Sequence, residues 1–250
     1  MGTMHVEKKR FTTKEQKIQD FSKHFEFKIA KSAQEMREIK RLRYDVFIKE
    51  MKYELESDPY HKTESDKFDE NSIHCLIRHR RTGMTAGYLR LITTEANKTN
   101  GLKILPIESE YHAEFYSDEL KPSSFSLDTV CEASRLAVSK TFRTPSIYNK
   151  MDFTDSEKSH FPMIVASLFA CSYALADLRK RTNMFAIMEP SLPRLLSLSG
   201  FKFKKIGKEI TIFGKRNPYH INRKLAESGA RNEIIMLCKN IKEEISLQIP

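Results

Sequence analysis

The sequence predicts one α/β layer domain of the α+β kind, with helical segments attached at both ends. Its 250 residues, 40% of them hydrophobic, are enough for one sizeable core. Strand-like and helix-like runs alternate along the chain, which is typical of a sheet covered by helices. No internal repeat or low-complexity linker divides it. We therefore expect a helical arm over 1–24, a core domain over 25–217 and a helical extension over 218–250.

The individual elements follow from the spacing of apolar residues. Apolar runs with strand character occur at 25–30, 73–80, 85–94, 129–140 and 184–189. Helical spacing predicts helices over 33–51, 161–181 and 190–200, the first beginning with the capping box Ser32-x-x-Glu35. The runs 201–207 and 209–216 predict a final hairpin, and 218–247 is expected to be mainly helical. The polar segment 95–127 is long for a connection, which favours a functional or mobile role.

Charge and cysteine content restrict the class of protein. The net charge of +10 attracts polyanions, but the Lys and Arg residues are dispersed and no nucleic-acid motif surrounds them. The four cysteines are widely spaced without a CxxC pair, which predicts neither a disulfide framework nor a zinc site. No metal-ligand or nucleotide-binding motif is present. The start lacks an apolar signal region, so we expect a reduced, cytoplasmic location.

The stretch CEASRLAV, residues 131–138, carries polar groups inside an apolar strand. On an ideal strand Glu132 and Ser134 share one face and Arg135 lies on the other. If Glu132 and Arg135 line one site, the strand must contain a bulge or a splay. Buried charges need partners. We expect an ion-pair network of Arg135 with these residues: Arg43, Asp66, Asp69 and Arg90. The alternative is an edge strand whose charges point into water.

Four blocks in order give the sequence a family resemblance. RLRYDVFIKEMKYE, ESDKFD, GYLRLI and CEASRLAV together resemble the acyl-homoserine-lactone (autoinducer) synthases. HCLIRHRRTG, LPIE and FGKRNPYHI resemble more closely the exosortase-associated (PEP-CTERM) acyltransferases and the long-chain N-acyl amino acid synthases. All these families belong to the N-acetyltransferase (GNAT) superfamily. The resemblance implies a mixed, mostly antiparallel sheet that splays between its fourth and fifth strands, here 129–139 and 184–189.

Three departures separate the chain from the autoinducer synthases. Tyr53 follows the first helix where those enzymes usually have Trp, and the chain continues well beyond residue 215. The glycine-containing loop that holds the pyrophosphate of coenzyme A in many relatives is missing, since SKTFRTPSIYN follows the fourth strand. These departures favour the N-acyl amino acid synthases and a donor carried on acyl carrier protein.

The resemblance implies an N-acyltransferase that moves a long-chain fatty acyl group from acyl carrier protein to the amine of an amino acid. Glu132 is then the expected base, acting through a water, and a backbone N–H of strand 129–139 stabilises the oxyanion. Ser134 orders the base or protonates the leaving thiolate. Arg90 and Arg135 hold the site together with the carboxylates or bind the acceptor carboxylate.

The remaining expectations concern the two substrates. Phe47, Leu168 and Phe169 are expected to line the acyl pocket. Lys140 and Arg143, just after the active strand, are expected to dock the acidic acyl carrier protein. We expect no permanently bound cofactor, acyl-coenzyme A as the alternative donor, and no nucleic-acid partner. A peripheral contact with the inner face of the membrane is compatible with the basic surface.

Three other functions stay open on the sequence alone. One is an acyl-homoserine-lactone synthase that uses S-adenosylmethionine. The second is a non-catalytic module that binds a membrane or nucleic acid through its basic surface. The third is a conventional acetyltransferase using acetyl-coenzyme A, which the missing glycine loop disfavours.

Overall fold

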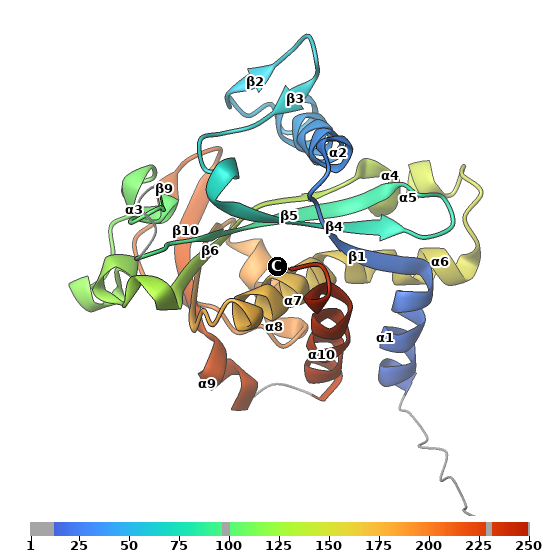
Figure 1. Cartoon of the computed structure of the whole chain (residues 1–250). Helices are drawn as coiled ribbons and strands as arrows, with labels where there is room; N and C mark the ends of the chain where they lie inside the picture. Colours follow the sequence, from blue (N-terminus) through green and yellow to red (C-terminus); the bar gives the residue numbers. More distant parts are fainter. Residues whose placement is uncertain (1–12, 97–100, 229–231, 250) are drawn as a thin grey trace, which may run out of the picture.

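The computed structural model describes residues 13–96, 101–228 and 232–249 (Figure 1). Its centre is one eight-stranded sheet in the order β1-β4-β5-β6-β7-β10-β8, with β9 paired beside β10. All neighbouring strands are antiparallel except β6 and β7. The strands are β1 (Phe25–Ile29), β4 (Ser72–His79), β5 (Thr85–Thr93), β6 (Val130–Val138), β7 (Asn183–Met188), β8 (Lys204–Lys205), β9 (Ile210–Thr211) and β10 (Lys215–Asn222). The predicted mixed α/β fold is confirmed.

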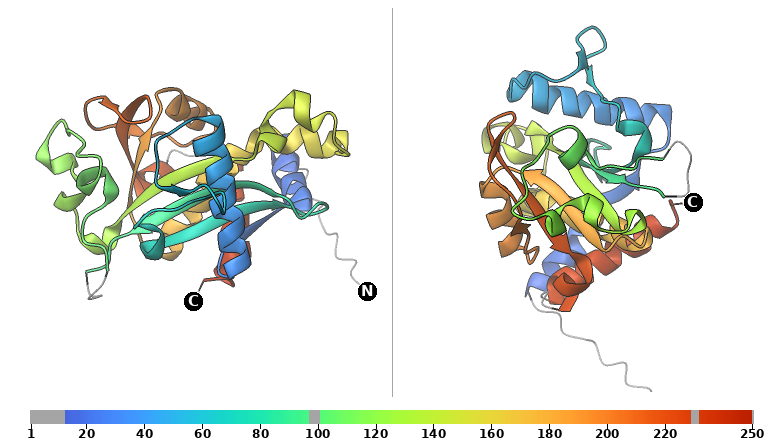
Figure 2. Two further views of the ribbon diagram at one scale, coloured as in Figure 1. Left: turned by 90° about the horizontal axis from the view of Figure 1, so that it is seen from above. Right: turned by 90° about the vertical axis from the view of Figure 1, so that its left-hand side faces the viewer.

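Helices cover both faces of the sheet (Figures 1 and 2). On one face lies α2 (Ala33–Arg43), which starts at the predicted capping box and continues as the π-helical segment η1 (Tyr44–Glu50). On the other face lies α7 (Ile164–Leu178), against which α10 (Asn232–Ser246) packs. Three layers result, and the larger core lies between the sheet and α7.

The other elements are short. They are α1 (Thr13–His24), the β2–β3 hairpin (Ser57–Asp58 and Thr63–Glu64), η2 (Asp69–Asn71), α3 (Pro106–Ser109), η3 (Asp118–Leu120), η4 (Pro122–Ser124), η5 (Leu127–Thr129), α4 (Lys140–Arg143), α5 (Pro145–Tyr148), α6 (Asp155–His160), η6 (Phe161–Met163), α8 (Ser191–Leu198) and α9 (Arg223–Ser228). The segment 95–127, expected to be irregular, contains α3, η3 and η4, and η5 begins at its last residue.

The strands β6 and β7 separate soon after they meet. Their parallel pairing covers only Val130–Glu132 opposite Asn183–Phe185. Beyond Glu132 the two strands diverge, because β6 continues along β5 while β7 follows β10. This is the splay that the family resemblance predicts between strands 129–139 and 184–189, and it opens the space for the site.

The C-terminal part of the sheet differs from the sequence expectation. Strand β10 runs to Asn222, so the expectation of a mainly helical 218–247 is wrong for residues 218–222. The predicted hairpin between 201–207 and 209–216 is also wrong, because β8 and β9 both pair with β10. The proposed boundary between residues 217 and 218 therefore falls inside a strand. The alternating pattern was obscured by Pro218 and by charged residues on the exposed side of the strand.

Both terminal segments contribute to the main core where they are described. Ile18 and Phe21 of α1 and Leu237 and Ile241 of α10 are buried in the same cluster as the sheet residues. The part of the predicted N-terminal arm over residues 1–12 lies outside the described residues. Within the described part, α1 and α10 therefore pack as parts of the domain.

Two cysteines are joined across the core. Cys75 of β4 and Cys171 of α7 form a disulfide, and both side chains are buried. The sequence, which argued against a disulfide framework, gave no indication of this pair, because its members are 96 residues apart and meet only through packing of the helix on the sheet. Cys131 is a buried thiol whose pKa is raised by burial to about 12. A thiol that stays protonated is a poor nucleophile, so Cys131 is not suited to nucleophilic catalysis.

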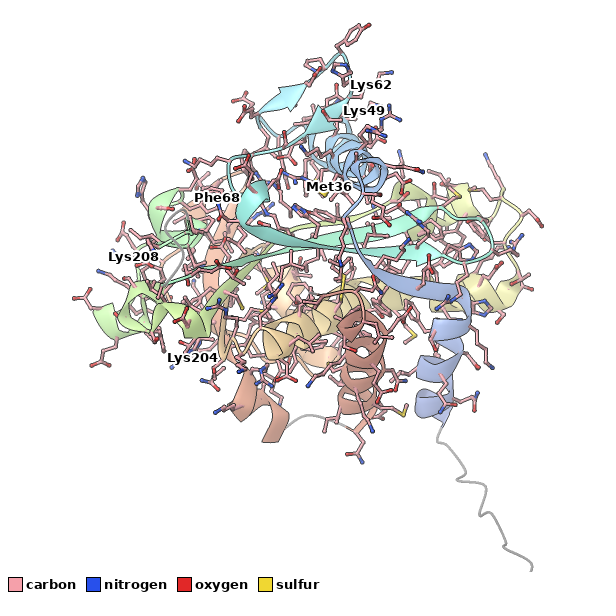
Figure 3. All side chains as sticks on the ribbon, in the orientation of Figure 1. Met36, Lys49, Lys62, Phe68, Lys204 and Lys208 are labelled. Carbon is pink, nitrogen blue, oxygen red and sulfur yellow. A yellow bond between two sulfur atoms is a disulfide. The ribbon has the colours of Figure 1, made fainter. Side chains whose placement is uncertain are left out.

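Surface charge and helix hydropathy are both explained by the fold. Figure 3 shows Lys49 and Lys62 on one side of the molecule and Lys204 and Lys208 at another, all four exposed. The positive charge is thus dispersed.

Among the described residues one helical run, Asp155–Leu178, has the length and hydropathy of a membrane span, but 67% of its most apolar window is buried in the protein. Core packing accounts for its composition.

Candidate active site

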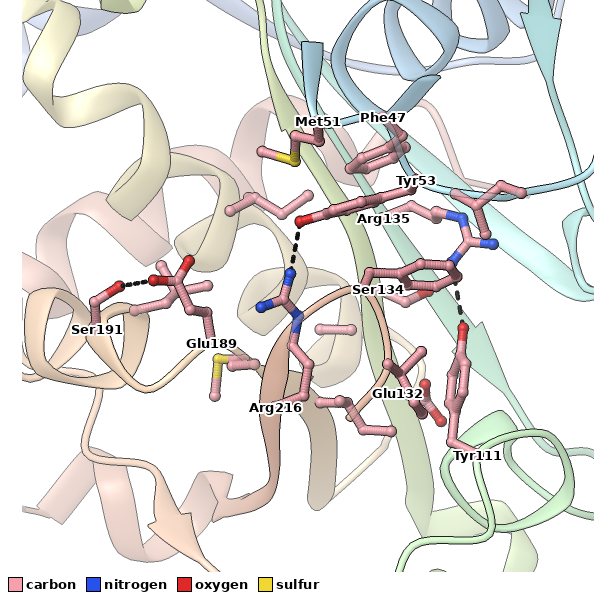
Figure 4. A pocket seen from close by; sticks show the side chains of 18 of the residues that line it. Phe47, Met51, Tyr53, Tyr111, Glu132, Ser134, Arg135, Glu189, Ser191 and Arg216 are labelled. Atoms are coloured by element: carbon pink, nitrogen blue, oxygen red, sulfur yellow. Dashed lines mark hydrogen bonds between the residues drawn. The ribbon is translucent and has the colours of Figure 1, made fainter. Parts of the chain in front are cut away.

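A cavity of about 450 Å³ lies where β6 and β7 diverge (Figure 4). Residues 132–136 of β6 form one wall, and residues 187–189 at the end of β7 form the opposite wall. Phe47 of η1 and Met51, which follows η1, close one side, and the turn between β9 and β10 closes another. The volume lies in the range of small-molecule sites. The residues that the sequence assigned to chemistry therefore line a cavity of suitable size.

Glu132 is the buried carboxylate of this cavity. Only 1% of its surface is exposed, and its Oε2 accepts a hydrogen bond from the backbone N–H of Ile107 at 2.9 Å. Burial raises the pKa of Glu132 to about 7, against the opposing effects of that N–H and of Arg90. A carboxylate with this pKa can take up and release a proton at neutral pH. The 95–127 segment thus supports the base through α3.

A bulge turns Arg135 toward the same site as Glu132. The β5–β6 pairing steps from Tyr88↔Ala137 to Arg90↔Ser134, so two residues of β6 face one residue of β5. Arg135 adopts a positive φ of 55°, an uncommon conformation for a residue with a side chain. Glu132 and Arg135 therefore both line the cavity. The bulge that the sequence required for this arrangement is present.

Three guanidiniums and three carboxylates form a buried network beside the cavity. The sequence named five of its members, and the structure brings all five together. The shorter contacts are Arg43 with Glu64, Arg43 Nη1 to Asp69 Oδ1 (2.6 Å), Arg90 Nη1 to Asp66 Oδ1 (2.5 Å), Arg90 Nη1 to Asp69 Oδ1 (2.7 Å), Arg135 Nη2 to Asp66 Oδ2 (2.8 Å) and Arg135 Nε to Glu64 Oε1 (3.2 Å).

The network keeps its two aspartates ionised. Burial raises the pKa of Asp69, but the Arg43 and Arg90 guanidiniums outweigh this effect and lower it to about 2. The pKa of Asp66 is likewise lowered, against burial, by its hydrogen bond to Arg90. Three positive and three negative groups balance, so the cluster tolerates burial.

The sequence missed one carboxylate of the network. Glu64 is fully buried and bridges Arg43 and Arg135. The block ESDKFD begins with Glu64, so the residue stood inside a motif that was already noticed. Its position on the short strand β3, which no apolar pattern marks, made it look like part of a solvated loop.

Two hydroxyl groups complete the polar side of the cavity. Ser134 Oγ accepts a hydrogen bond from Arg90 Nε at 3.0 Å, which leaves its own proton for another acceptor. Tyr111 OH lies 3.3 Å from Arg135 Nη1 and also lines the cavity (Figure 4). Tyr111 comes from the long 95–127 segment, and nothing in the sequence pattern singled it out.

An aromatic stack forms a further wall of the cavity. Tyr53 lies between Phe47 and Phe213, with ring centroids at 6.1 Å and 4.9 Å and interplanar angles of 11° and 23°. Arg216 of β10 donates a hydrogen bond from Nη2 to Tyr53 OH at 2.7 Å (Figure 4). Sequence reasoning missed Arg216, although the quoted block FGKRNPYHI contains it.

The three residues predicted to line the acyl pocket do not lie together. Phe47 lines the cavity. Leu168 and Phe169 do not: both are buried in the core beneath the sheet, Leu168 beside Gly87 and Phe169 against Phe203. The two residues therefore do not line the proposed acyl pocket, because α7 directs both side chains into the core.

The two residues expected to dock a carrier protein lie on α4. Lys140 is exposed. Arg143 is also on the surface, but it forms an ion pair with Glu50 and donates a hydrogen bond from Nε to Val138 O at 3.0 Å. Lys140 is therefore the more available cation for a partner.

Comparison with known proteins agrees with this geometry. Residues 42–151 match the model of an acetyltransferase (GNAT) domain. No curated protein sequence matches the chain. The matched region contains the end of α2, η1, the β4–β5 hairpin, the network and β6. The matched domain is an acyltransferase domain, so the expected class of enzyme, an acyltransferase, is confirmed at that level.

Solved structures show the same fold at low sequence identity. The acyl-homoserine lactone (AHL) synthase LasI aligns over 83% of this chain and 96% of its own, with a TM-score of 0.60 and 14% identity. The CoA-dependent acyl-homoserine lactone synthase BjaI, solved with SAM and isopentyl-CoA, covers 87% and 89%, with 0.59 and 18%. FeeM, an N-acyl amino acid synthase from uncultured soil microbes, covers 85% and 98%, with 0.54 and 13%.

Proposed function

We propose that the protein is an N-acyltransferase that moves a long-chain fatty acyl group from an acyl carrier protein thioester to the amine of an amino acid. One observation carries the proposal: Glu132, a buried carboxylate with a pKa of about 7, lies in a largely apolar cavity between two splayed strands of a GNAT fold. A buried base beside a lipophilic space suits the acylation of an amine.

In this reaction Glu132 takes a proton from the acceptor ammonium, directly or through a water. The free amine attacks the thioester carbonyl and the C–N bond forms. The tetrahedral intermediate collapses and the C–S bond breaks. The thiolate accepts the proton held by Glu132, directly or relayed through Ser134, and the second proton of the attacking nitrogen is released to solvent. Positioned bases contribute about 10²–10⁴-fold to such rates. The hydrogen bond from Arg90 holds Ser134 in position to order the base or to protonate the thiolate.

The oxyanion of the intermediate needs donors on β6. Pairing with β7 ends at Glu132, so the backbone from Ala133 onward turns toward the cavity instead of a strand partner on that side. A backbone N–H there is our candidate donor. The bulge at Arg135 adds curvature to this wall. Loss of one such donor typically costs about 10²–10³-fold in rate.

The acyl chain has an apolar path. A second cavity of about 410 Å³ shares Met51 and Leu136 with the first. It continues along β6 between η1 and the α4–α7 region, and Phe142, Phe161 and other apolar side chains line it. Phe47 remains our candidate for the junction with the reaction centre. The two cavities together offer room for a long chain.

The donor and the location are extensions of the same proposal. Lys140, with Arg143 beside it, is the candidate docking surface for the acidic carrier protein, and acyl-coenzyme A is the alternative donor. No permanently bound cofactor is required by this mechanism. A cytoplasmic enzyme with access to the inner membrane face, in a role related to the PEP-CTERM acyltransferases, is consistent with a lipophilic product.

An acyl-homoserine-lactone synthase is the second candidate, because the fold is shared with LasI and BjaI. Mass spectrometry of lipid extracts from a strain expressing the protein distinguishes the two. We expect N-acyl amino acids in the wild-type extract and their absence with Glu132→Gln. An acyl-homoserine lactone in place of N-acyl amino acids would select the second function, and no new acylated amine would overturn both.

A further inference from the structure

We propose that Arg216, oriented by Tyr53, binds the carboxylate of the acceptor and so restricts the enzyme to amino acids whose carboxylate is free. The inference rests on the proposed N-acyl transfer and adds the residue that recognises the acceptor. It assigns to the β9–β10 side of the cavity a binding role that the network on the opposite side does not provide.

The guanidiniums in and beside the cavity differ in whether a carboxylate partner neutralises them. Arg135 lines it, but Glu64 and Asp66 already neutralise Arg135. Arg90 is likewise bound to two carboxylates. Arg216 has no carboxylate within ion-pairing distance in the part of the chain that the structure describes, and its two hydrogen bonds go to neutral oxygens. An unneutralised guanidinium that faces a ligand cavity is suited to an anionic ligand group.

The contacts of Arg216 leave it able to bind. Nη2 donates to Tyr53 OH at 2.7 Å and Nη1 donates to the backbone oxygen of Lys215 at 3.1 Å. These two bonds use two of the five N–H donors of the guanidinium. The guanidinium carbon also lies 5.9 Å from the centre of the Tyr53 ring. The side chain is therefore held in place with donors still available for a planar carboxylate.

A constrained turn and an aromatic stack lie behind Arg216. Phe213 and Gly214 both have positive φ, 52° and 89°, in the tight turn that joins β9 to β10. A positive φ is unfavourable for Phe, so surrounding contacts must maintain it. Phe213 stacks on Tyr53, and Tyr53 stacks on Phe47. The stack fixes the hydroxyl that orients Arg216.

Glu189 is the other carboxylate near Arg216, and it does not act as the counter-ion of that guanidinium. Glu189 lines the cavity, but it accepts a hydrogen bond from Ser191 Oγ at 3.0 Å, and no ion pair joins it to Arg216 among the described residues. Figure 4 shows Glu189 and Ser191 on the β7–α8 side and Arg216 reaching toward Tyr53. The cavity thus presents a cation for a carboxylate while Glu132 supplies the base.

Two substrate anions could meet a guanidinium here: the carboxylate of the acceptor and the phosphodiester of the donor's phosphopantetheine. The acceptor is favoured by position. In an α-amino acid one carbon separates the reacting nitrogen from the carboxylate carbon, so the carboxylate must lie in the cavity that contains Glu132. Arg216 lines that cavity. The phosphodiester is separated from the thioester by the whole pantetheine arm.

The test compares acceptors with and without the carboxylate charge. The purified full chain receives dodecanoyl acyl carrier protein and each of the twenty amino acids, as the free acid and as the methyl ester. The wild type should acylate free acids with a KM about 10–100-fold lower than the esters. In Arg216→Gln the KM for the free acid should rise by that factor, with kcat little changed, while the ester kinetics stay the same. Arg216→Lys should recover part of the preference.

Tyr53→Phe tests the positioning role. It keeps the aromatic ring and removes the hydroxyl, so we expect a smaller rise in the free-acid KM, about 3–10-fold, with unchanged ester kinetics. Lys208→Gln removes the same charge at an exposed residue that pairs with Glu114 and should change neither acceptor. Thermal unfolding of each variant verifies that it is folded.

The outcomes separate the inference from the proposed function. If the wild type acylates no amino acid and no ester, the proposed function fails and the inference fails with it. If the wild type forms N-acyl amino acids but Arg216→Gln retains the full preference for free acids, only the inference is overturned. Repeating the series with an S-acyl-N-acetylcysteamine donor, which has no phosphate, decides the source of the anion: a loss that persists supports the carboxylate, and a loss that vanishes assigns Arg216 to the donor.

Discussion

The guanidiniums on the two sides of the cavity differ in whether carboxylates neutralise them. On the β5–β6 side, Arg43, Arg90 and Arg135 are each bound by two or more carboxylates. On the β10 side, Arg216 contacts only neutral oxygens among the described residues. Buried charges in a balanced network maintain geometry, whereas a cation without a counter-ion can bind a substrate. The same residue type therefore serves structure on one side and recognition on the other.

The largest expected difference between the two sides is in stability. Arg43→Met removes one of the two guanidiniums that contact each of Glu64 and Asp69 and leaves the buried network with an unbalanced negative charge, so we expect the free energy of unfolding to fall by about 3–5 kcal/mol. Arg216→Met removes no buried counter-ion and should change it by about 1 kcal/mol or less. Urea unfolding of the two variants measures both values. Equal losses would show that the two guanidiniums do not differ as described.

Glu132 should destabilise the fold when it is ionised. Its pKa of about 7 in the folded protein exceeds the ordinary value of 4.5, so ionisation costs folding free energy as pH rises from about 4.5 through 7. Glu132→Gln should therefore be more stable than the wild type at pH 8, by on the order of 3 kcal/mol, and nearly equal to it at pH 4.5. A difference in unfolding free energy that is the same at both pH values would contradict the raised pKa.

Part of this arrangement could be predicted from the sequence, and the reasons are specific. CEASRLAV placed charges in an apolar strand, and desolvation cost required partners for them, which led to Arg43, Asp66, Asp69 and Arg90. The need for a bulge followed from the two-residue period of a strand. The structure contains both the network and the bulge.

Other features depended on contacts that no local pattern records. Glu64 and Tyr111 lie in segments without apolar periodicity, and they reach the site only through the folding of those segments over the sheet. Arg216 lies in β10, a strand whose pattern was obscured, so its approach to Tyr53 across 163 residues was not predictable. Leu168 and Phe169 lie on a helix that is buried nearly all round, so hydropathy could not tell which face meets a ligand.

The pH dependence of the rate sharpens the assignment of the base. Because Glu132 takes its proton from the ammonium form of the acceptor, kcat/KM should rise about tenfold per pH unit below about 7 and level off above it, until the acceptor amine loses its own proton. Steady-state kinetics between pH 5 and 9 measure the profile. A bend near 4.5 would indicate an exposed carboxylate as the base.

The smallest effect is expected at the docking surface. The Lys140→Glu and Arg143→Glu double variant should lower kcat/KM with acyl carrier protein by about 3–10-fold, and added salt should lower the wild-type value similarly. Acyl-coenzyme A should be affected less, because it lacks the acidic protein surface. Most of the loss should come from Lys140, since Arg143 already pairs with Glu50. Equal effects on both donors would move docking elsewhere.

The most direct measurement is thioester consumption by purified wild type and Glu132→Gln with an acyl carrier protein donor and amino acid acceptors. The two side chains have nearly the same shape, and the Ile107 N–H can still donate to the Gln oxygen, so the cavity keeps its form. We predict N-acyl amino acid formation by the wild type and a rate about 10²–10⁴-fold lower in the folded variant. Equal rates in the two proteins would contradict a base at Glu132 and with it the proposed chemistry of this cavity.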